Sequence, residues 1–431
     1  GNKKADYCGR LGKSNQNNNK LNGSSMKFYT LFIGLLMSIQ VFAQSAEESK
    51  IKFELGGFVR TDALFDSRQT ISLRDNAIMI APAPESMDKF SQDINAAPNL
   101  TMFALHTRLS GKATGIEAMG AKITGYLEGE FFGLSDNDIN GFRLRHGFVR
   151  FDWENTSILF GQFWHPMFST EVIPSFSFAA PFIPYSRNPQ IRITQKLSNY
   201  SLSFTALTQR DFTSSGPDEK NNSVKSNTFL KNSYLPMLDL QLQAKYDNLF
   251  LGAGGDYKSL VPRLKAQDGT KTDERINSYA FTLYGKVVPA KDLSLKFQGV
   301  YGQNLADITI AGGYAISAED TTKFTNLNTM TAWGELSYGS NVTYNLFVGY
   351  SKNLGSDKNT TGKYFGFMNN MDNLIRVAPN VSFIFSKMKI TTELDYSKAV
   401  YGDILKGEKS EIGNKYNVYN LRVSLSCTYS F

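Results

Sequence analysis

The last eleven residues of the chain alternate strictly between apolar and polar side chains. The apolar face ends on an aromatic residue and comprises Leu421, Val423, Leu425, Cys427, Tyr429 and Phe431. Ser, Thr and Arg occupy the alternate positions. A period of two places the two sets on opposite faces of a β-strand. The length and pattern are typical of a strand that crosses an outer membrane, apolar toward lipid and polar toward a lumen.

The same alternation recurs along the chain and predicts a barrel over residues 51–431. The candidate strands lie near residues 55–61, 103–109, 123–131, 141–153, 156–165, 188–197, 202–206, 238–246, 249–257, 279–287, 293–301, 330–338, 342–350, 377–385, 390–396 and 421–431. The alternation breaks at His146 and Gly147, where a β-bulge would restore one continuous face. The predicted fold class is all-β: a transmembrane antiparallel β-barrel of about 16 strands, an even number as barrels with both ends in the periplasm require.

The connections between these segments alternate in length. Turns of a few residues, such as Asp247–Asn248 and Gly339–Asn341, join alternate pairs of strands. Longer polar stretches fall between them, near residues 67–98, 166–187, 211–235, 259–273, 304–325, 353–373 and 401–414, and a shorter one falls near 134–140. Long loops on one rim and tight turns on the other are typical of an outer-membrane barrel. A soluble β-sandwich or β-propeller has no reason to alternate in this way.

One long connection departs from this polar composition. Residues 165–188 contain four prolines and a set of aromatic side chains, Phe168, Phe176, Phe178, Phe182 and Tyr185. Such a stretch is poorly suited to lying free in water. We expect this third long connection to fold inward and narrow the lumen. The alternative is that it packs against a neighbouring subunit.

The N-terminal region predicts export. Met26 and Lys27 precede an apolar run that ends in the small-residue signature Val41-Phe42-Ala43. We interpret residues 26–43 as a secretory signal peptide. Residues 44–50 would then form a short periplasmic tail. Residues 1–25 are polar and rich in Asn and Lys, and we interpret them as an upstream extension outside the mature protein.

Removal of this leader changes the charge of the protein. The whole chain has a formal net charge of +7, but residues 1–43 hold six basic residues and one acidic residue, which leaves 40 basic and 38 acidic residues. A nearly neutral chain gives no reason to expect a nucleic-acid partner. Cys427 is the one cysteine after the leader, so no internal disulfide is expected. After Val41, the sequence has no run of about 18 apolar residues that would predict a membrane-spanning helix.

Charged residues occupy inward-facing positions of several predicted strands. The arginines that we select as pore-lining and substrate-attracting candidates are Arg60, Arg108, Arg143, Arg145 and Arg192. Guanidinium groups hold carboxylates with paired hydrogen bonds, so unpaired arginines at a constriction would attract anions. Glu128 and Glu130 lie on the strand before Arg143 and Arg145. These four residues can instead form a salt-bridge ladder along the wall, and both arrangements can coexist.

Several segments resemble the DcaP-type trimeric outer-membrane porins. The resemblance is carried by residues 57–63 (GFVRTDA), 103–109 (FALHTRL), 125–133 (GYLEGEFFG), 142–149 (FRLRHGFV), 161–164 (GQFW) and 188–192 (NPQIR). It is clearest over residues 51–210 and architectural beyond them. It implies a homotrimer of sixteen-stranded barrels in the outer membrane of a Gram-negative bacterium, passing small anionic solutes that include dicarboxylates. Residues 44–50 are too few to form the periplasmic coiled coil of some members.

The function predicted by these observations is a water-filled porin for small hydrophilic solutes, with anions such as dicarboxylates favoured. The alternatives are a non-selective porin and an oligosaccharide or phosphate porin. A barrel-embedded hydrolase would need a Ser-His or Asp-His constellation, and none of His106, His146 and His165 lies near an evident nucleophile in the sequence. We therefore expect no enzymatic activity.

No cofactor or metal ion is expected. Residues 136–141 match the opening of a calcium-binding loop, but the twelfth position is Gly147 where such a loop needs Glu. The expected partners are outer-membrane lipid, lipopolysaccharide and small anionic solutes. A terminal aromatic residue such as Phe431 also resembles the signal that the outer-membrane barrel assembly machinery reads.

Overall fold

The computed structural model describes residues 51–431 except 134–135, 177–178, 267–268 and 406. The predicted upstream extension, signal peptide and periplasmic tail therefore lie outside the described residues, as does Phe178. In the part of the chain that is described, no helix is long and apolar enough to cross a membrane.

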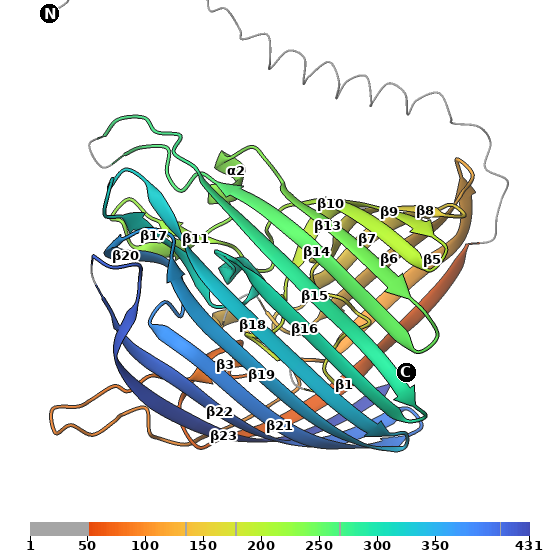
Figure 1. Ribbon diagram of the computed structural model, residues 1–431. Coiled ribbons are helices and arrows are strands. Elements are labelled where there is room, and N and C mark those ends of the chain that lie inside the picture. Colours follow the sequence, from red (N-terminus) through yellow and green to blue (C-terminus); the bar gives the residue numbers. More distant parts are fainter. Residues whose placement is uncertain (1–50, 134–135, 177–178, 267–268, 406) are drawn as a thin grey trace, which may run out of the picture. The chain divides into compact units, whose positions relative to one another are not determined.

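Over these residues, 16 antiparallel strands form a closed barrel, which confirms the predicted fold class (Figure 1). In chain order the wall consists of β1 (Lys52–Asp66), β4 with β5 (Asn99–Phe103 and Arg108–Ala118), β6 (Ala121–Glu130), β7 (Arg143–Asp152), β8 (Thr156–Trp164), β9 (Arg187–Leu197), β10 (Tyr200–Leu207), β13 (Met237–Lys245), β14 (Leu249–Leu260), β15 (Ile276–Ala290), β16 (Leu293–Gln303), β18 (Phe324–Gly339), β19 (Val342–Ser356), β21 (Met371–Phe385), β22 (Met388–Ile404) and β23 (Ile412–Ser430).

The barrel closes because β1 pairs on both of its sides. Its residues pair with β4 and β5 on one side and with β23 on the other, where Phe58 stands opposite Ser430. β4 and β5 follow one another along the same side of β1, so together they act as one strand of the wall. Every strand of the wall therefore has two neighbours, and the sheet has no free edge.

Burial alternates along the strands as the sequence predicts. In β13, Asp239 and Gln241 are buried, whereas Leu238, Leu240 and Leu242 are exposed. Polar side chains thus face the inside of the barrel, and apolar side chains form its outer surface. A continuous apolar outer surface is stable in the hydrocarbon of a bilayer and not in water. The exposed apolar side chains therefore mark the wall that faces the membrane.

The bulge predicted at the start of β7 is present. Glu128 of β6 pairs with His146, and the next residue, Gly129, pairs with Leu144. Arg145 is therefore the extra residue of β7, opposite no residue of β6. As a result, Arg145 and His146 are both buried although they are adjacent in the sequence.

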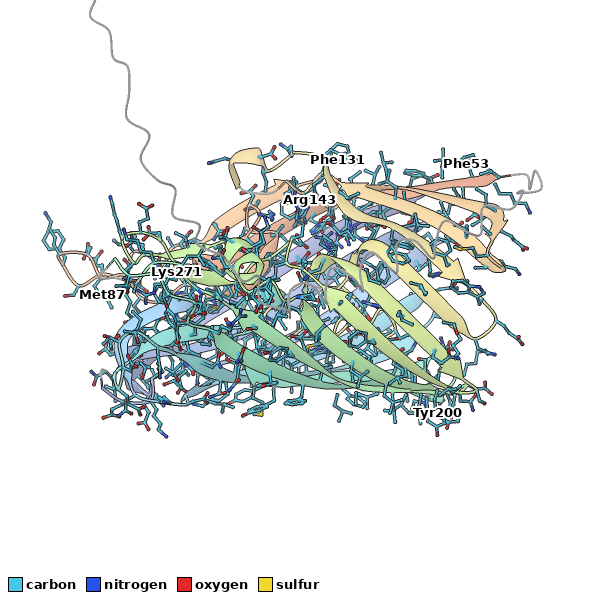
Figure 2. All side chains as sticks on the ribbon, turned by 90° about the horizontal axis from the view of Figure 1, so that it is seen from above. Phe53, Met87, Phe131, Arg143, Tyr200 and Lys271 are labelled. Atoms are coloured by element: carbon cyan, nitrogen blue, oxygen red, sulfur yellow. The ribbon has the colours of Figure 1, made fainter. Side chains whose placement is uncertain are left out.

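The two ends of the barrel differ in the lengths of their connections. In Figure 2, Met87 and Lys271 lie at the end with long connections, and Phe53 and Tyr200 lie at the opposite end. The long connections contain the shorter elements β2 (Thr70–Leu73), β3 (Ile78–Pro82), η2 (Asp136–Asp138), β11 (Ser215–Pro217), β12 (Ser223–Lys225), α2 (Thr228–Asn232), η3 (Ala306–Ile308), β17 (Gly312–Ser317) and β20 (Thr360–Phe367). β22 and β23 also extend into the region 401–414 that was expected to be loop, because hairpin pairing can continue beyond the apolar part of the wall.

Candidate functional site

A cluster of arginines surrounds one buried carboxylate on the inner wall. Glu130 of β6 is 1% exposed, and its oxygens lie 2.7 Å from Arg143 Nη2, 3.1 Å from Arg187 Nη1 and 3.4 Å from Arg108 Nε. It also pairs with Arg145. These four arginines come from β5, β7 and β9, and we call them the arginine cluster. The predicted ladder of glutamates and arginines is therefore present and gains Arg108 and Arg187.

Two further carboxylates complete this network. Glu128 Oε1 lies 2.5 Å from Arg145 Nε. Asp211, in the long connection after β10, lies 2.8 Å from both Arg143 and Arg187. Burial by itself would raise the pKa of the Asp211 carboxyl, but the two adjacent guanidinium groups hold it below its usual range. Four positive groups thus face three carboxylates, and most of the charge of the cluster is compensated within the wall.

Arg60 is also paired. Its guanidinium group lies 2.7 Å from Asp62 on the same strand, and the other oxygen of Asp62 lies 2.8 Å from His106 Nδ1. The guanidinium carbon of Arg60 is 5.0 Å from the centre of the Phe176 ring in the third long connection. Arg60 therefore links the wall at β1 to that connection.

Arg192 differs from the other candidate arginines. Its Nε donates to Gln190 Oε1 at 3.0 Å and its Nη2 donates to the carbonyl oxygen of Trp164 at 2.7 Å. Neither partner carries a negative charge, and the described residues offer it no carboxylate at ion-pair distance. The positive charge of Arg192 is therefore not neutralised by a direct partner.

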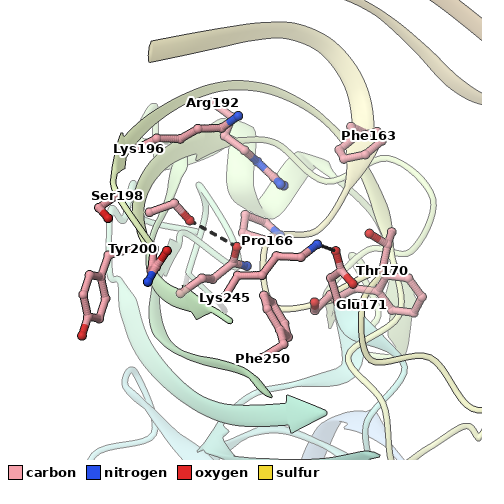
Figure 3. Close-up of a pocket in the computed structure, with 15 residues that line it drawn as sticks. Phe163, Pro166, Thr170, Glu171, Arg192, Lys196, Ser198, Tyr200, Lys245 and Phe250 are labelled. Carbon is pink, nitrogen blue, oxygen red and sulfur yellow. Dashed lines mark hydrogen bonds and ion pairs between the residues drawn. The ribbon is translucent and has the colours of Figure 1, made fainter. Parts of the chain in front are cut away.

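Arg192 lines a cavity of about 450 Å³ inside the barrel (Figure 3). Lys196 and Lys245 line the same cavity, and Lys245 Nζ lies 2.6 Å from Glu171 of the third long connection. The cavity reaches Ser198 and Asn199, which form the short turn between β9 and β10. It therefore lies toward the end with short turns. Lys196 and Lys245 were not among the candidates chosen from the sequence, although their alternation with Arg192 and Gln243 already indicated inward positions.

The third long connection contacts the inner wall far from β8 and β9, the strands that it joins. The backbone N–H and the hydroxyl of Ser175 both donate to Glu335 of β18 at 2.7 Å. Lys296 of β16 donates to the carbonyl oxygen of Ile173 at 2.8 Å, and Arg376 of β21 donates to that of Ala180 at 2.7 Å. These contacts hold the connection against inward-facing side chains of three strands on the opposite part of the wall.

The aromatic residues selected in this connection have different neighbours. Phe168 stacks on Trp164 with ring centres 4.2 Å apart, and its ring also contacts Tyr185. Phe182 packs against Phe347 of β19 and lies under the guanidinium group of Arg376. Phe176 lies under Arg60, as described above. The described aromatic candidates are thus packed against the barrel interior rather than exposed to water.

The expectation that the third long connection alone departs from polar surface loops was wrong. Residues of β3, in the first long connection, are buried, and Arg376 Nη2 donates to the carbonyl oxygen of Ile80 at 3.1 Å. Ile308, in the connection after β16, accepts a hydrogen bond of 2.9 Å from the backbone of Tyr185. The signal was present in the sequence as the apolar run Ile78–Ala81 and the mostly apolar segment Ile308–Ala311. Three connections therefore pack together inside the barrel.

These features define the class of the fold. A closed barrel of 16 antiparallel strands, an apolar outer wall and a charged interior are the architecture of an outer-membrane β-barrel of the porin type. The inward-facing side chains of the described strands are mostly polar or charged, and buried apolar clusters lie where the connections fold inside the barrel.

Comparisons with solved structures agree with this class. The chain is similar to the outer membrane channel DcaP of Acinetobacter baumannii, with a TM-score of 0.67 and 18% identity over 90% of this chain and 100% of that one. It is also similar to OmpT, an outer membrane protein of Vibrio cholerae, with a TM-score of 0.53 and 12% identity over 90% of this chain and 100% of that one. The trimer form of OmpT gives a TM-score of 0.50 with 12% identity over 88% and 99% of the two chains.

Comparisons of sequence give no further assignment. No family model matches the chain, and no curated protein matches it. The similarity to DcaP agrees with the resemblance indicated by the sequence motifs, and at this level of identity it concerns the fold.

Proposed function

We propose that the protein is an outer-membrane porin through which small hydrophilic solutes diffuse, with anions such as dicarboxylates favoured. The observation that carries this proposal is the cavity in front of Arg192, where a guanidinium group without a carboxylate partner faces open space beside Lys196 and Lys245. A carboxylate solute can provide the negative charge that the wall does not.

The size of the expected effect follows from electrostatics. Two unit charges in contact near a protein surface attract by about 4 kcal/mol, and the attraction fades beyond about 10 Å at 0.1 M salt. A local arrangement of two or three cations can therefore favour anions although the whole mature chain is nearly neutral. Lys245 contributes less than Arg192, because Glu171 already pairs with it.

The other arginines have different parts in this proposal. Arg143 and Arg145 are almost fully buried and paired, so their main role is to hold the wall together with Glu128 and Glu130. Arg60 and Arg108 keep 21% and 24% of their side-chain surface exposed. We assign to these two, with Arg192, the attraction of anions into the lumen.

We further propose that the third long connection forms the constriction of the pore. Its hydrogen bonds to Glu335, Lys296 and Arg376 support this, because they hold it across the interior of the barrel. The alternative that it packs against a neighbouring subunit gains no support from these inward contacts. A homotrimer is supported by the architecture shared with OmpT, for which a trimer form is known. No catalytic role is proposed for the three histidines.

The test is a comparison of purified wild-type protein with Arg192→Gln in planar bilayers and in liposomes. Under a salt gradient, the wild type should give a reversal potential of the sign expected for anions, and Arg192→Gln should move it toward zero. Uptake of succinate should fall relative to uptake of a neutral sugar of similar size. Lys323→Gln is the matched control, since it removes one positive charge from an exposed loop.

Each result decides one part of the proposal. Wild-type protein without conductance would overturn the porin function itself. Equal passage of succinate and the neutral sugar in the wild type would favour the non-selective or oligosaccharide alternative. Unchanged selectivity in Arg192→Gln would show that the anion preference does not arise at the cavity.

A further inference from the structure

The outer wall of the barrel carries a groove where β10, β13, β14 and β15 lie side by side. Gly255 of β14 stands in register between Leu240 of β13 and Phe281 of β15. Leu240 and Phe281 are more than half exposed, whereas Gly255 has no side chain, so a hollow of about 210 Å³ remains between them. The lining includes the outward side chains of Phe204, Leu238, Leu240, Tyr257, Tyr279 and Phe281, together with the buried residues Asp239 and Asp256. We call this hollow the outer groove, and its surface suits a hydrocarbon chain.

A second pocket lies beyond the outer groove, at the end with long connections. It has a volume of about 540 Å³, and its lining includes Arg210, Leu230, Lys231, Tyr234, Leu235 and Pro236. We call it the rim pocket. Pro236 of the rim pocket directly precedes β13, and Leu238 of the outer groove is the second residue of that strand. The rim pocket and the outer groove therefore follow the same strand from the rim into the membrane-facing wall.

Among the described residues, the positive charges at the rim pocket have no acidic partner at ion-pair distance. Arg210 and Lys231 are exposed, and neither forms an ion pair with any carboxylate in the described ranges. Arg275 lies 4.9 Å from the centre of the Tyr234 ring and donates to the carbonyl oxygen of Ser233, again without an ion pair. By contrast, the loop residue Lys358 pairs with Glu319 at 3.1 Å. The rim pocket thus combines apolar surface with uncompensated positive charge.

We propose that the rim pocket and the outer groove together bind a phosphorylated glycolipid of the outer leaflet. One acyl chain lies in the outer groove over Gly255, and a phosphate group lies between Arg210 and Lys231. Clustered cations beside a membrane bind anionic lipid headgroups, each contributing on the order of 1 kcal/mol. The ring of Tyr234 is 80% exposed and offers a face for a sugar. Long connections mark this end as external, which is the side of that leaflet.

The phosphate contact is tested with the variant Arg210→Gln/Lys231→Gln. Protein in detergent is titrated with lipid A that carries phosphates and examined by native mass spectrometry. The wild type should retain lipid A, and the double variant should bind it at least about tenfold more weakly, as the loss of two cation contacts implies. Lys323→Gln/Lys358→Gln removes the same charge from other loops and should bind like the wild type.

The acyl contact is tested with Gly255→Leu, which fills the outer groove. A Cβ atom added at Gly255 would meet Phe281 at 3.4 Å, an ordinary contact, so the barrel should still form. This variant should lose affinity for lipid A while its channel conductance stays that of the wild type. Conductance therefore separates a failure of lipid binding from a failure of the porin function.

Three outcomes would overturn the proposal. The first is equal binding of lipid A by the wild type and by both variants. The second is equal binding of lipid A with and without phosphates, or full competition by inorganic phosphate, since the site would then not recognise a phosphorylated lipid. The third is that the variants differ from the wild type in the number of chains in the assembly and not in the amount of bound lipid. That result would assign this face to contact between copies of the chain.

Discussion

Glu335 of β18 accepts two hydrogen bonds from Ser175, one from its backbone N–H and one from its hydroxyl, both at 2.7 Å. Glu335 is 1% exposed, and its charge is balanced by Lys296 at 3.2 Å. The two hydrogen-bonded residues are separated by 160 positions in the sequence. This contact joins the third long connection to the wall opposite its own strands, and the dimensions of the proposed constriction depend on it.

Breaking this contact should widen and loosen the pore. Hydrogen bonds to a charged group contribute about 1.5–3 kcal/mol each, so Glu335→Ala should free the connection around Ser175. We expect a higher single-channel conductance with more current noise. Ser175→Ala keeps the backbone hydrogen bond and should have a smaller effect. Identical conductance and noise in all three proteins would show that the contact does not control the constriction.

Removing two arginines from the arginine cluster should expose its carboxylates. In Arg143→Ala/Arg145→Ala, Glu128 and Glu130 lose their closest partners, so reversal potentials should shift toward cations and dicarboxylate uptake should slow. Breaking a buried ion pair costs about 3–5 kcal/mol, and the melting temperature should fall as well.

Adding Glu128→Gln to that double variant provides the control, because it removes the carboxylate whose arginine partner is Arg145. The selectivity and the melting temperature should then return part of the way to the wild-type values. If the arginine changes leave both conductance and selectivity unaltered, Arg143 and Arg145 are purely structural, and the attraction of anions falls to Arg60, Arg108 and Arg192.

The anion preference should weaken as the ionic strength rises. The Debye length falls from about 10 Å at 0.1 M salt to about 3 Å at 1 M, so the field of Arg192 in an open cavity becomes screened. Reversal potentials measured at a constant concentration ratio should approach zero between these concentrations. A preference that persists at 1 M would indicate direct binding of the ion rather than an attraction through solvent.

The ion pairs of Asp211 should stabilise the protein down to acidic pH. Because Arg187 and Arg143 lower the pKa of this carboxyl below 3.8, the stabilisation is fully present above that value and is lost as the pH falls through the lowered pKa. The difference in melting temperature between the wild type and Asp211→Asn should therefore be constant from pH 7 to pH 5 and shrink below about pH 4. A difference that shrinks between pH 7 and pH 5 would show that the pKa of Asp211 is raised rather than lowered.

The strands of the barrel could be predicted because each strand residue meets one of two solvents. Lipid on one side and a charged interior on the other impose a period of two, which β13 and β23 show over most of their length. The same rule indicated a bulge at His146 and Gly147, where the alternation breaks, and the extra residue in the structure is the adjacent Arg145. Alternating connection lengths then followed from the two ends of the barrel.

Which arginines are paired with a carboxylate could not be predicted in the same way. Arg143 and Arg145 face Glu128 and Glu130 on the adjacent strand, and this pairing was visible as an alternative in the sequence. Arg187 and Asp211 complete the network across 24 positions, the first at the start of β9 and the second in the long connection after β10. Alternation says which way a side chain points but not what comes within ion-pair distance of it.

The sequence by itself therefore determined the architecture: the number of strands, their inward and outward faces and the rim that carries the long connections. These properties depend on each residue and its close neighbours, so the local alternation of apolar and polar residues predicts them. Only the tertiary structure decided which charges are neutralised, that three connections pack together inside the barrel, and that Arg192 is left facing a cavity. Those properties depend on segments far apart in the chain, and a local pattern carries no information about the distance between them.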